Sequence, residues 1–241
     1  MMRSLLDFIL PPRCCVCEAS TTGAPIPWVC PSCWHGIEPV EPPICYQCGE
    51  PFAAPPEGIA SPLHRCGLCL SNPPTFAQAR AIGLYRGVLQ DVIHAMKYWP
   101  VYGLSRPLAQ LLQHQFATHW AEISPDLLVP VPLHRRRLRQ REFDQALALA
   151  RYLSQGVHIP CQAEVLTRQR YTASQVGLNR TERDQNVRGA FDVRQPQAVQ
   201  GKAVLLIDDV YTTGATVKEC ARVLRHAGAA WVGVYTLARV G

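Results

Sequence analysis

The chain has 241 residues, of which 48% are hydrophobic and 17% are charged, and its formal net charge at pH 7 is +6. This composition excludes an intrinsically disordered chain, and the length is sufficient for one sizeable core plus an accessory module. The net charge is too small to establish nucleic-acid binding by itself, but only three of the 24 basic residues are lysine, which favours anionic partners bound by arginine.

The N-terminal stretch MMRSLLDFILPP is apolar but is interrupted by Asp7. It is too short for the core of a signal peptide, and we interpret it as a short helix packed on its domain, with a membrane-binding amphipathic helix as the alternative. No apolar run approaches the ~20 residues of a membrane-spanning helix, so no transmembrane segment is predicted. The expected location is the cytoplasm, where clustered cysteines bind metal rather than form disulfides.

Cysteine, proline and charge are distributed unevenly. Nine of the 11 cysteines lie between residues 14 and 69, and 14 of the 21 prolines precede residue 75. Residues 1–75 hold 3 Arg and 6 acids, a net charge of −3, whereas residues 76–241 hold 21 Arg plus Lys and 12 acids, a net charge of +9. We therefore predict two domains, 1–75 and 76–241, that meet in the sequence SNPPTF at 71–76.

Four Cys-x-x-Cys pairs occupy the first domain: Cys14–Cys17, Cys30–Cys33, Cys45–Cys48 and Cys66–Cys69. Each such turn places two thiolates on one side of a metal, and two turns complete a tetrahedral Zn²⁺ site. The sequence therefore predicts a double zinc ribbon with two structural Zn²⁺ sites. Sequential pairing is the simplest, and a cross-braced pairing stays open, as does Cys15 in place of Cys14. Redox-active pairs are the weaker alternative, because no thioredoxin-like βαβ pattern surrounds them.

The second domain alternates predicted strands and helices. Strands are predicted at 81–85, 127–131, 204–207 and 231–237, and helices at 88–98, 104–120, 143–153 and 217–227. Such alternation is typical of a parallel α/β sheet, in which ligands bind outside the carboxyl ends of the strands. The ends of the strands 127–131 and 204–207 are therefore expected to face one crevice.

An arginine-rich stretch follows the first of these two strands. Five of the seven residues from 135 to 141 are arginine: Arg135, Arg136, Arg137, Arg139 and Arg141. Because arginine binds phosphate through two parallel hydrogen bonds, we expect this stretch to hold an anionic group such as a pyrophosphate. The alternative is the solvated basic start of a helix.

Two carboxylates and a hydroxyl-rich turn follow the second strand. Asp208 and Asp209 come first, and the turn consists of Thr212, Thr213, Gly214, Ala215 and Thr216. Backbone N–H groups at a helix start bind phosphate, and small residues let the backbone come close to it. Carboxylates accept hydrogen bonds from sugar hydroxyls, so the pattern predicts a ribose 5-phosphate site. The alternative is a strand end with ordinary solvated acids.

This stretch resembles the phosphoribosyl pyrophosphate binding motif of type I phosphoribosyltransferases, except that Tyr211 stands where that family usually has an aliphatic residue. A wider set of motifs resembles the ComF/GntX family of competence and DNA-uptake-related proteins over nearly the whole chain. It consists of the four cysteine pairs, IHAMKY (93–98), VPVPLHRRRLRQREFDQA (129–146), YTASQVGLNRTERDQNVRGAF (171–191) and the 204–216 motif. One motif departs from that family, which usually reads RGFNQA where this chain has REFDQA, with Glu142 and Asp144.

The resemblance implies an α/β fold, a parallel-sheet type I phosphoribosyltransferase domain preceded by the zinc-ribbon module. It also implies roles for single residues. Asp208 and Asp209 would bind the ribose hydroxyls with Mg²⁺ nearby, and residues 212–216 would cradle the 5-phosphate. His134 and Arg135 would belong to the pyrophosphate loop, and residues 168–188 would form a mobile flap. Lys97 is a further candidate phosphate contact.

The function implied is binding of phosphoribosyl pyrophosphate with Mg²⁺, linked to DNA uptake and natural competence. Phosphoribosyl transfer is the candidate reaction, with Asp208 and Asp209 orienting the sugar and Arg135 and Arg137 stabilising the departing pyrophosphate. The alternative is a non-catalytic module for single-stranded DNA, which would use the arginine-rich stretches and stacking aromatics, and would work with DNA-uptake proteins. A nucleic-acid regulator built on the zinc ribbon is a third interpretation. The sequence does not name an acceptor.

Overall fold

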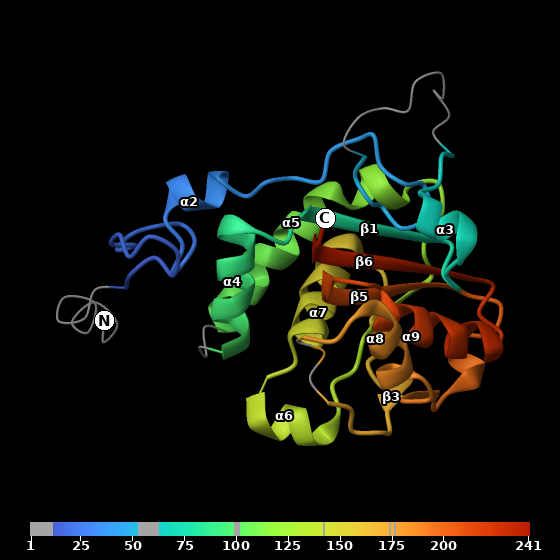
Figure 1. The fold of residues 1–241 in the computed structure, drawn as a ribbon. Helices are drawn as coiled ribbons and strands as arrows, with labels where there is room; N and C mark the ends of the chain where they lie inside the picture. The colour runs from blue at the N-terminus through green and yellow to red at the C-terminus, as the bar shows by residue number, and fades with distance from the viewer. Residues whose placement is uncertain (1–11, 53–62, 99–101, 142, 174, 176) are drawn as a thin grey trace.

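The computed structural model describes residues 12–52, 63–98, 102–141, 143–173, 175 and 177–241 (Figure 1). Its centre is a four-stranded sheet in the order β1-β6-β5-β2, in which each strand is parallel to its neighbours. The strands are β1 (Gln78–Leu84), β2 (Leu127–Pro130), β5 (Ala203–Tyr211) and β6 (Trp231–Arg239). This confirms the predicted parallel α/β architecture.

One face of the sheet is covered by three helices, α4 (Gly87–Tyr98), α5 (Ser105–Trp120) and α7 (Gln145–Val157). Their apolar stripes bury Leu205 and Ile207 of β5 in a shared hydrophobic core. Strands buried on both faces are expected to be continuously apolar, and this explains why the run before the acidic pair has no polar alternation.

The opposite face is covered mainly by α9 (Ala215–His226), which packs on Val204 and Leu206 of β5 in a second core. Three smaller elements complete this side: β3 (Leu166–Arg168), α8 (Arg180–Val187) and β4 (Phe191–Val193). The remaining described elements are α2 (Pro31–His35), α3 (Gly67–Ser71), α6 (Arg135–Arg141) and the 3₁₀ turns Tyr102–Leu104 and Pro196–Ala198.

The cysteine-rich segment contributes to both cores. Cys14 and Cys30 lie in the core of α4, α5 and α7, whereas Cys45 and Cys48 lie in the core of α9. The chain between them runs along the edge of β1, where the Val40 N–H donates to the Ile82 carbonyl at 3.0 Å (Figure 1). The two pairs of cysteine turns are therefore placed against opposite faces of the sheet.

The difference from the predicted elements that matters most for the site concerns β5. The sequence predicts that this strand ends at Ile207, but it continues to Tyr211, so that prediction is wrong at its carboxyl end. The extension exists because β6 runs alongside it and pairs Asp208 with Thr236 and Tyr211 with Arg239. A polar dipeptide alone would not be expected to extend a strand.

Smaller boundaries move for local reasons. Helix α7 begins at Gln145 instead of Phe143, because the Asp144 side chain caps it by accepting a 3.0 Å hydrogen bond from the Leu147 N–H. Helix α8 lies within the predicted flap and has little apolar periodicity. A capping box between Asn179 and Glu182 marks its start. The predicted N-terminal helix and Glu142 lie outside the described residues. None of the helices in the described part of the chain combines the length and apolarity that a membrane crossing requires.

Candidate functional site

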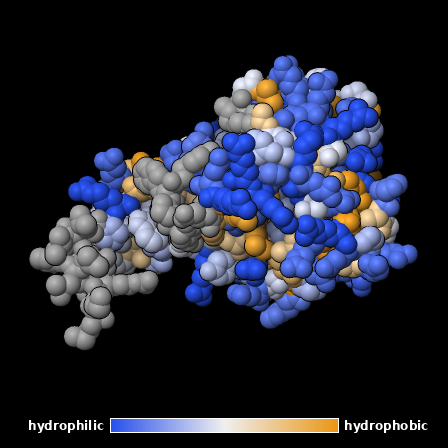
Figure 2. Space-filling view, turned by 90° about the horizontal axis from the view of Figure 1, so that it is seen from below, coloured by the Kyte–Doolittle hydropathy of each residue, from blue (hydrophilic) through white to orange (hydrophobic). Residues whose placement is uncertain are grey.

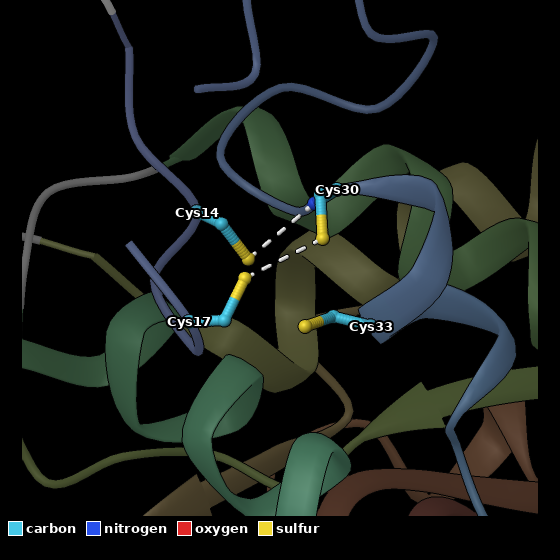
Figure 3. A group of neighbouring side chains, drawn as sticks. All are labelled: Cys14, Cys17, Cys30 and Cys33. Atoms are coloured by element: carbon cyan, nitrogen blue, oxygen red, sulfur yellow. Dashed lines mark hydrogen bonds between the residues drawn. The ribbon is translucent and has the colours of Figure 1, made fainter. Parts of the chain in front are cut away.

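The eight paired cysteines gather into two groups of four: Cys14, Cys17, Cys30 and Cys33, and Cys45, Cys48, Cys66 and Cys69. Within each group all sulfur atoms lie within 4.8 Å of one another, and Figure 3 shows the first four side chains converging. Four thiolates around zinc, each about 2.3 Å from the metal, lie about 3.8 Å apart. The observed separations of 3.6 Å between Cys17 and Cys30 and 3.7 Å between Cys48 and Cys66 fit that geometry.

Sequential pairing of the cysteine turns is therefore confirmed, and the cross-braced alternative is wrong. Cys15 lies outside the first group, and its backbone N–H donates to the Trp28 carbonyl at 2.8 Å. These are the two closed, all-sulfur structural zinc sites of a double zinc ribbon, with no ligand position left for a substrate.

Each group also holds a cysteine suited to be a thiolate. The Ser32 hydroxyl lies 3.1 Å from Cys30 Sγ and contributes most to lowering the pKa of that thiol to about 6. A hydrogen bond from the Cys48 thiol is the main cause that lowers the pKa of Cys45 to about 4, and the Cys66 N–H adds a 3.2 Å bond. Not all of the other cysteines share this property, since burial raises the pKa of Cys33 and the hydrogen bond to Cys45 raises that of Cys48. Zinc binding would therefore have to displace the protons of these thiols.

A cavity of about 490 Å³ opens beyond the carboxyl ends of β2 and β5. Its charged lining consists of Asp144, Asp208 and Asp209 on the acidic side and of Lys97, Arg137, Arg168 and Arg183 on the basic side. Thr212 and Thr216 also line it. The expectation that the two strand ends face one crevice is therefore confirmed, and this is where ligands bind in open parallel sheets.

The acidic pair is held in an asymmetric way. Lys97 Nζ lies 2.7 Å from Asp209 Oδ2, and the two side chains are only 15% and 14% exposed. Burial alone would lower the pKa of Lys97, but the charge of Asp209 and its hydrogen bond outweigh burial and raise that pKa. Lys97 is therefore a permanent cation in the cavity wall.

For Asp208, no cation among the described residues lies within ion-pair distance. Its Oδ1 accepts the Asp209 backbone N–H at 2.9 Å. Enclosure by the surrounding protein, and secondly the neighbouring carboxylate of Asp209, raise the pKa of Asp208 to about 8. Asp209 is thus paired with a cation, whereas Asp208 is available to a bound cation or hydrogen-bond donor.

The turn after β5 forms a small recess of about 30 Å³ that adjoins the cavity and is lined by Thr212, Gly214, Ala215 and Thr216. Gly214 has a φ of 77° and precedes α9, and the first residues of that helix line the recess. Backbone N–H groups at a helix start can bind an anion. A Cβ atom at Gly214 would overlap with the Tyr211 hydroxyl. The glycine is therefore needed both for its backbone conformation and for space.

The predicted flap closes against this turn. Gln175 Nε2 donates to Thr216 Oγ1 at 3.1 Å, and Arg137 donates to the Ala173 carbonyl at 3.1 Å. Arg168 is buried at 7% exposure and bonds to the Thr172 hydroxyl. Residues of the flap thus contact both the hydroxyl-rich turn and Arg137.

Of the predicted site residues, the cavity brings together Lys97, Arg137, Asp208, Asp209, Thr212 and Thr216, and the recess adds Gly214 and Ala215. Arg135 is exposed on the first turn of α6 and does not line the cavity. The His134 ring contacts the Tyr171 ring edge to face, with ring centres 5.3 Å apart. Thr213 Oγ1 accepts a 3.5 Å hydrogen bond from the Ala215 N–H at the start of α9.

Outside the cavity, α6 and Tyr171 form an exposed basic and aromatic patch. The Arg136 guanidinium lies 4.8 Å from the centre of the Tyr171 ring, which is 41% exposed. Figure 2 views the molecule from the side of α6 and shows a mostly hydrophilic face with scattered apolar patches.

Sequence reasoning missed three charged residues of the cavity: Asp144, Arg168 and Arg183. Asp144 stood out only as a departure from a motif, yet burial raises its pKa against the opposing hydrogen bonds of backbone N–H groups. Arg168 belongs to the three-residue strand β3, and a strand this short has no periodic signal. Only its place in the arginine-rich flap pointed to it.

Each half of the chain matches a known domain family. Residues 5–70 match the double zinc ribbon domain, and residues 144–241 match the phosphoribosyl transferase domain.

Similar proteins extend over most of the chain. The DNA utilization protein YhgH of Escherichia coli K12 is 36% identical over 201 residues, which are 81% of this chain and 84% of that protein. Competence protein F of Haemophilus influenzae is 31% identical over 216 residues, covering 88% and 90% of the two chains. Competence protein ComFC of Bacillus subtilis is 28% identical over 218 residues, covering 88% and 84%.

Proposed function

The chain belongs to the family of the DNA utilization protein YhgH and competence protein F, and from this membership we propose that it binds phosphoribosyl pyrophosphate with Mg²⁺. One observation carries the proposal. A single cavity is lined by an acidic pair, a hydroxyl-rich turn at a helix start and a group of cations, which are the three chemistries that a phosphorylated, pyrophosphorylated sugar requires.

Each part of the ligand would contact a different group of residues in the cavity. The 5-phosphate would accept hydrogen bonds from the backbone N–H groups and hydroxyls of residues 212–216, and the ribose hydroxyls would donate to Asp208 and Asp209. The pyrophosphate would lie toward Arg137 and Arg168. Mg²⁺, when bound, would neutralise charge on the phosphate oxygens, and carboxylates such as those of the acidic pair are its usual protein ligands.

Phosphoribosyl transfer is the reaction that this arrangement suits. The bond between C1 of the ribose and the pyrophosphate oxygen would break, and an acceptor would form the new bond at C1. Arg137 would stabilise the charge that gathers on the leaving group, and the acidic pair would hold the sugar in place. We assign this reaction to the cytoplasm, where reducing conditions keep the zinc-binding cysteines from forming disulfides.

Calorimetry with phosphoribosyl pyrophosphate and Mg²⁺ tests the binding step. We expect saturable binding that weakens more than tenfold in the double variant Asp208→Asn plus Asp209→Asn. In this variant the ribose hydroxyls lose carboxylate acceptors, and Mg²⁺ loses its carboxylate ligands. Asp91→Asn, which changes an exposed acid of α4 outside the cavity, is the matched control. No binding by the wild type would overturn the ligand assignment. A pyrophosphate-release assay across nucleobases and amines then tests turnover.

A second candidate function is binding of single-stranded DNA at the patch formed by α6 and Tyr171. It is supported by the exposed Tyr171 ring with Arg136 over it, since exposed aromatics stack on bases and arginines contact phosphates. The names of the relatives, which refer to DNA utilization and competence, agree with it. We expect affinity for an oligonucleotide to fall steeply with salt and at least fivefold in Tyr171→Ala. An affinity that ignores both would remove this candidate.

A further inference from the structure

We propose that the second zinc site, held by Cys45, Cys48, Cys66 and Cys69, positions the phosphate-binding turn 212–216 through Arg239 and Tyr211. The first zinc site does not have this role. The inference rests on the proposed function for the identity of the ligand. Its structural part, the link from a zinc site to the turn, is independent of which phosphate compound binds.

The second zinc site and the turn share one hydrophobic core. Cys45 and Cys48 are buried in the same core as Tyr211 and Ala215. Phe76 belongs to this core too, and its ring centre lies 6.2 Å from that of Tyr211 in an edge-to-face contact. Cys14 and Cys30 of the first site belong to the core on the other face of the sheet. Since packed cores transmit displacement, only the second site is expected to affect the turn directly.

Arg239 makes the polar part of the link. It is the last residue of β6, and it is only 2% exposed. Its Nη1 donates to the Cys48 carbonyl at 2.5 Å, and its other terminal nitrogen pairs with the Glu50 carboxylate. The same guanidinium lies 5.2 Å from the centre of the Tyr211 ring. A buried arginine needs such partners, and two of them come from the second pair of cysteine turns.

The cysteine turn at 45–49 is itself fastened to the sheet. The Gln47 carbonyl accepts the Ala79 N–H at 2.7 Å, and Arg80 donates to the Tyr46 carbonyl at 2.9 Å. A Cβ atom at Gly49 would lie 2.7 Å from the Ala79 carbonyl oxygen, so the turn lies directly against β1. Without zinc the four thiols no longer have a common partner, and these contacts lose the constraint that holds the turn in shape.

Tyr211 transmits the position to the turn. It is the last residue of β5, it is 6% exposed, and its ring contacts the Arg239 guanidinium. The hydroxyl end of the ring occupies the space that a side chain at Gly214 would need. A shift of the ring is therefore expected to shift Gly214 and the backbone N–H groups of 212–216. Tyr211 and Arg239 are positioning residues that act through this backbone.

Paired zinc-ligand variants test the proposal in the full-length protein. Cys69→Ser alters the second site, and Cys33→Ser alters the first as the matched control. Each is expected to retain one of the two zinc ions, which metal analysis verifies. Hydrogen exchange of the peptide spanning 211–218 should become at least tenfold faster in Cys69→Ser and should change less than twofold in Cys33→Ser. Affinity for phosphoribosyl pyrophosphate with Mg²⁺ should fall at least tenfold in the first variant only.

Two further variants keep the test decisive if Cys69→Ser does not fold. Arg239→Met should retain both zinc ions and still accelerate exchange of the 211–218 peptide. Tyr211→Phe should keep wild-type exchange, whereas Tyr211→Ala should not. Equal effects of the two zinc-site variants, or unchanged exchange in Arg239→Met, would overturn the coupling. If the wild type does not bind the ligand, the proposed function fails, and the exchange data still decide the coupling.

Discussion

At the scale of single residues, the adjacent acids Asp208 and Asp209 of the candidate site have different electrostatic environments. Asp209 pairs with Lys97 at 2.7 Å, whereas Asp208 forms no ion pair within the described part of the chain, and burial raises its pKa to about 8. The cavity therefore holds one settled ion pair and one carboxyl group whose ionisation is unfavourable until a cation or donor arrives. The strength of the ion pair and the ionisation of Asp208 can both be measured in the protein without ligand.

Lys97→Met is expected to lower the free energy of unfolding by about 3 kcal/mol, because it leaves the largely buried carboxylate of Asp209 without its partner. Urea denaturation measures this change. Adding Asp209→Asn to Lys97→Met should recover much of the loss, since no unpaired charge remains. Lys202→Met, at an exposed position, serves as the control. Additive effects of Lys97→Met and Asp209→Asn would show that the pair is not coupled.

Asp208→Asn is expected to stabilise the protein in alkaline solution. The raised pKa means that the folded state keeps the Asp208 proton between pH 3.8 and about 8, where the unfolded chain has lost it. Stability from this group is therefore complete below the lower value and is lost as the pH rises through the higher one. Melting temperatures should show a gain for the variant near pH 9 that shrinks toward pH 5. Asp91→Asn should show no such trend, and an equal gain at both pH values would contradict the interpretation.

At the scale of elements, the turn 212–216, which we propose binds phosphate, depends on the junction between β5 and α9. The strand continues through the acidic pair to Tyr211, and α9 begins at Ala215, so only three residues connect the strand to the helix. This compactness requires the positive φ of Gly214 and leaves no space for a Cβ atom there. The geometry that would hold a phosphate is thus produced by a strand end, a glycine and a helix start.

Gly214→Ala should therefore abolish binding of phosphoribosyl pyrophosphate and lower the free energy of unfolding by more than about 2 kcal/mol, because backbone strain and overlap with Tyr211 add together. Gly201→Ala is a closely matched control: its φ is 70°, and no atom lies within 4 Å of the added Cβ. It should cost only about 1 kcal/mol from the left-handed backbone and leave binding unchanged. Calorimetry and urea denaturation of both variants provide the comparison.

At the scale of the whole molecule, the zinc ribbon is continuous with the phosphoribosyltransferase domain. Its first site is buried in one core of the sheet and its second site in the other, and buried Arg239 joins the second site to β6. We therefore expect the two structural zinc ions to stabilise both faces of the sheet.

Removal of zinc by a strong chelator should destabilise the entire protein. We expect differential scanning calorimetry to show one unfolding transition whose midpoint falls after chelation, because zinc binding contributes to the stability of the shared cores. Restoring Zn²⁺ should restore the midpoint, which serves as the control. Two separate transitions, of which only the smaller responds to zinc, would contradict the continuity of the cores.

Contiguous residues made much of this protein predictable. The four cysteine pairs, the acidic pair and the turn 212–216 each carry their chemistry within a few residues, so the sequence alone determined the zinc ribbon, the sheet class and the family. Boundaries were less predictable: β5 runs past Ile207 because β6 pairs with it, and that pairing has no local signal.

Only the tertiary structure decided which side chains meet. It paired the cysteine turns in sequential order, turned Arg137 toward the cavity and Arg135 toward solvent, and brought Lys97 to Asp209 across more than a hundred residues of chain. It also placed Arg239 between a zinc-binding turn and Tyr211. Such contacts depend on how distant segments pack in three dimensions, whereas motifs depend on neighbours along the chain. The sequence therefore determined the chemistry available, and the packing determined how it is assembled into one site.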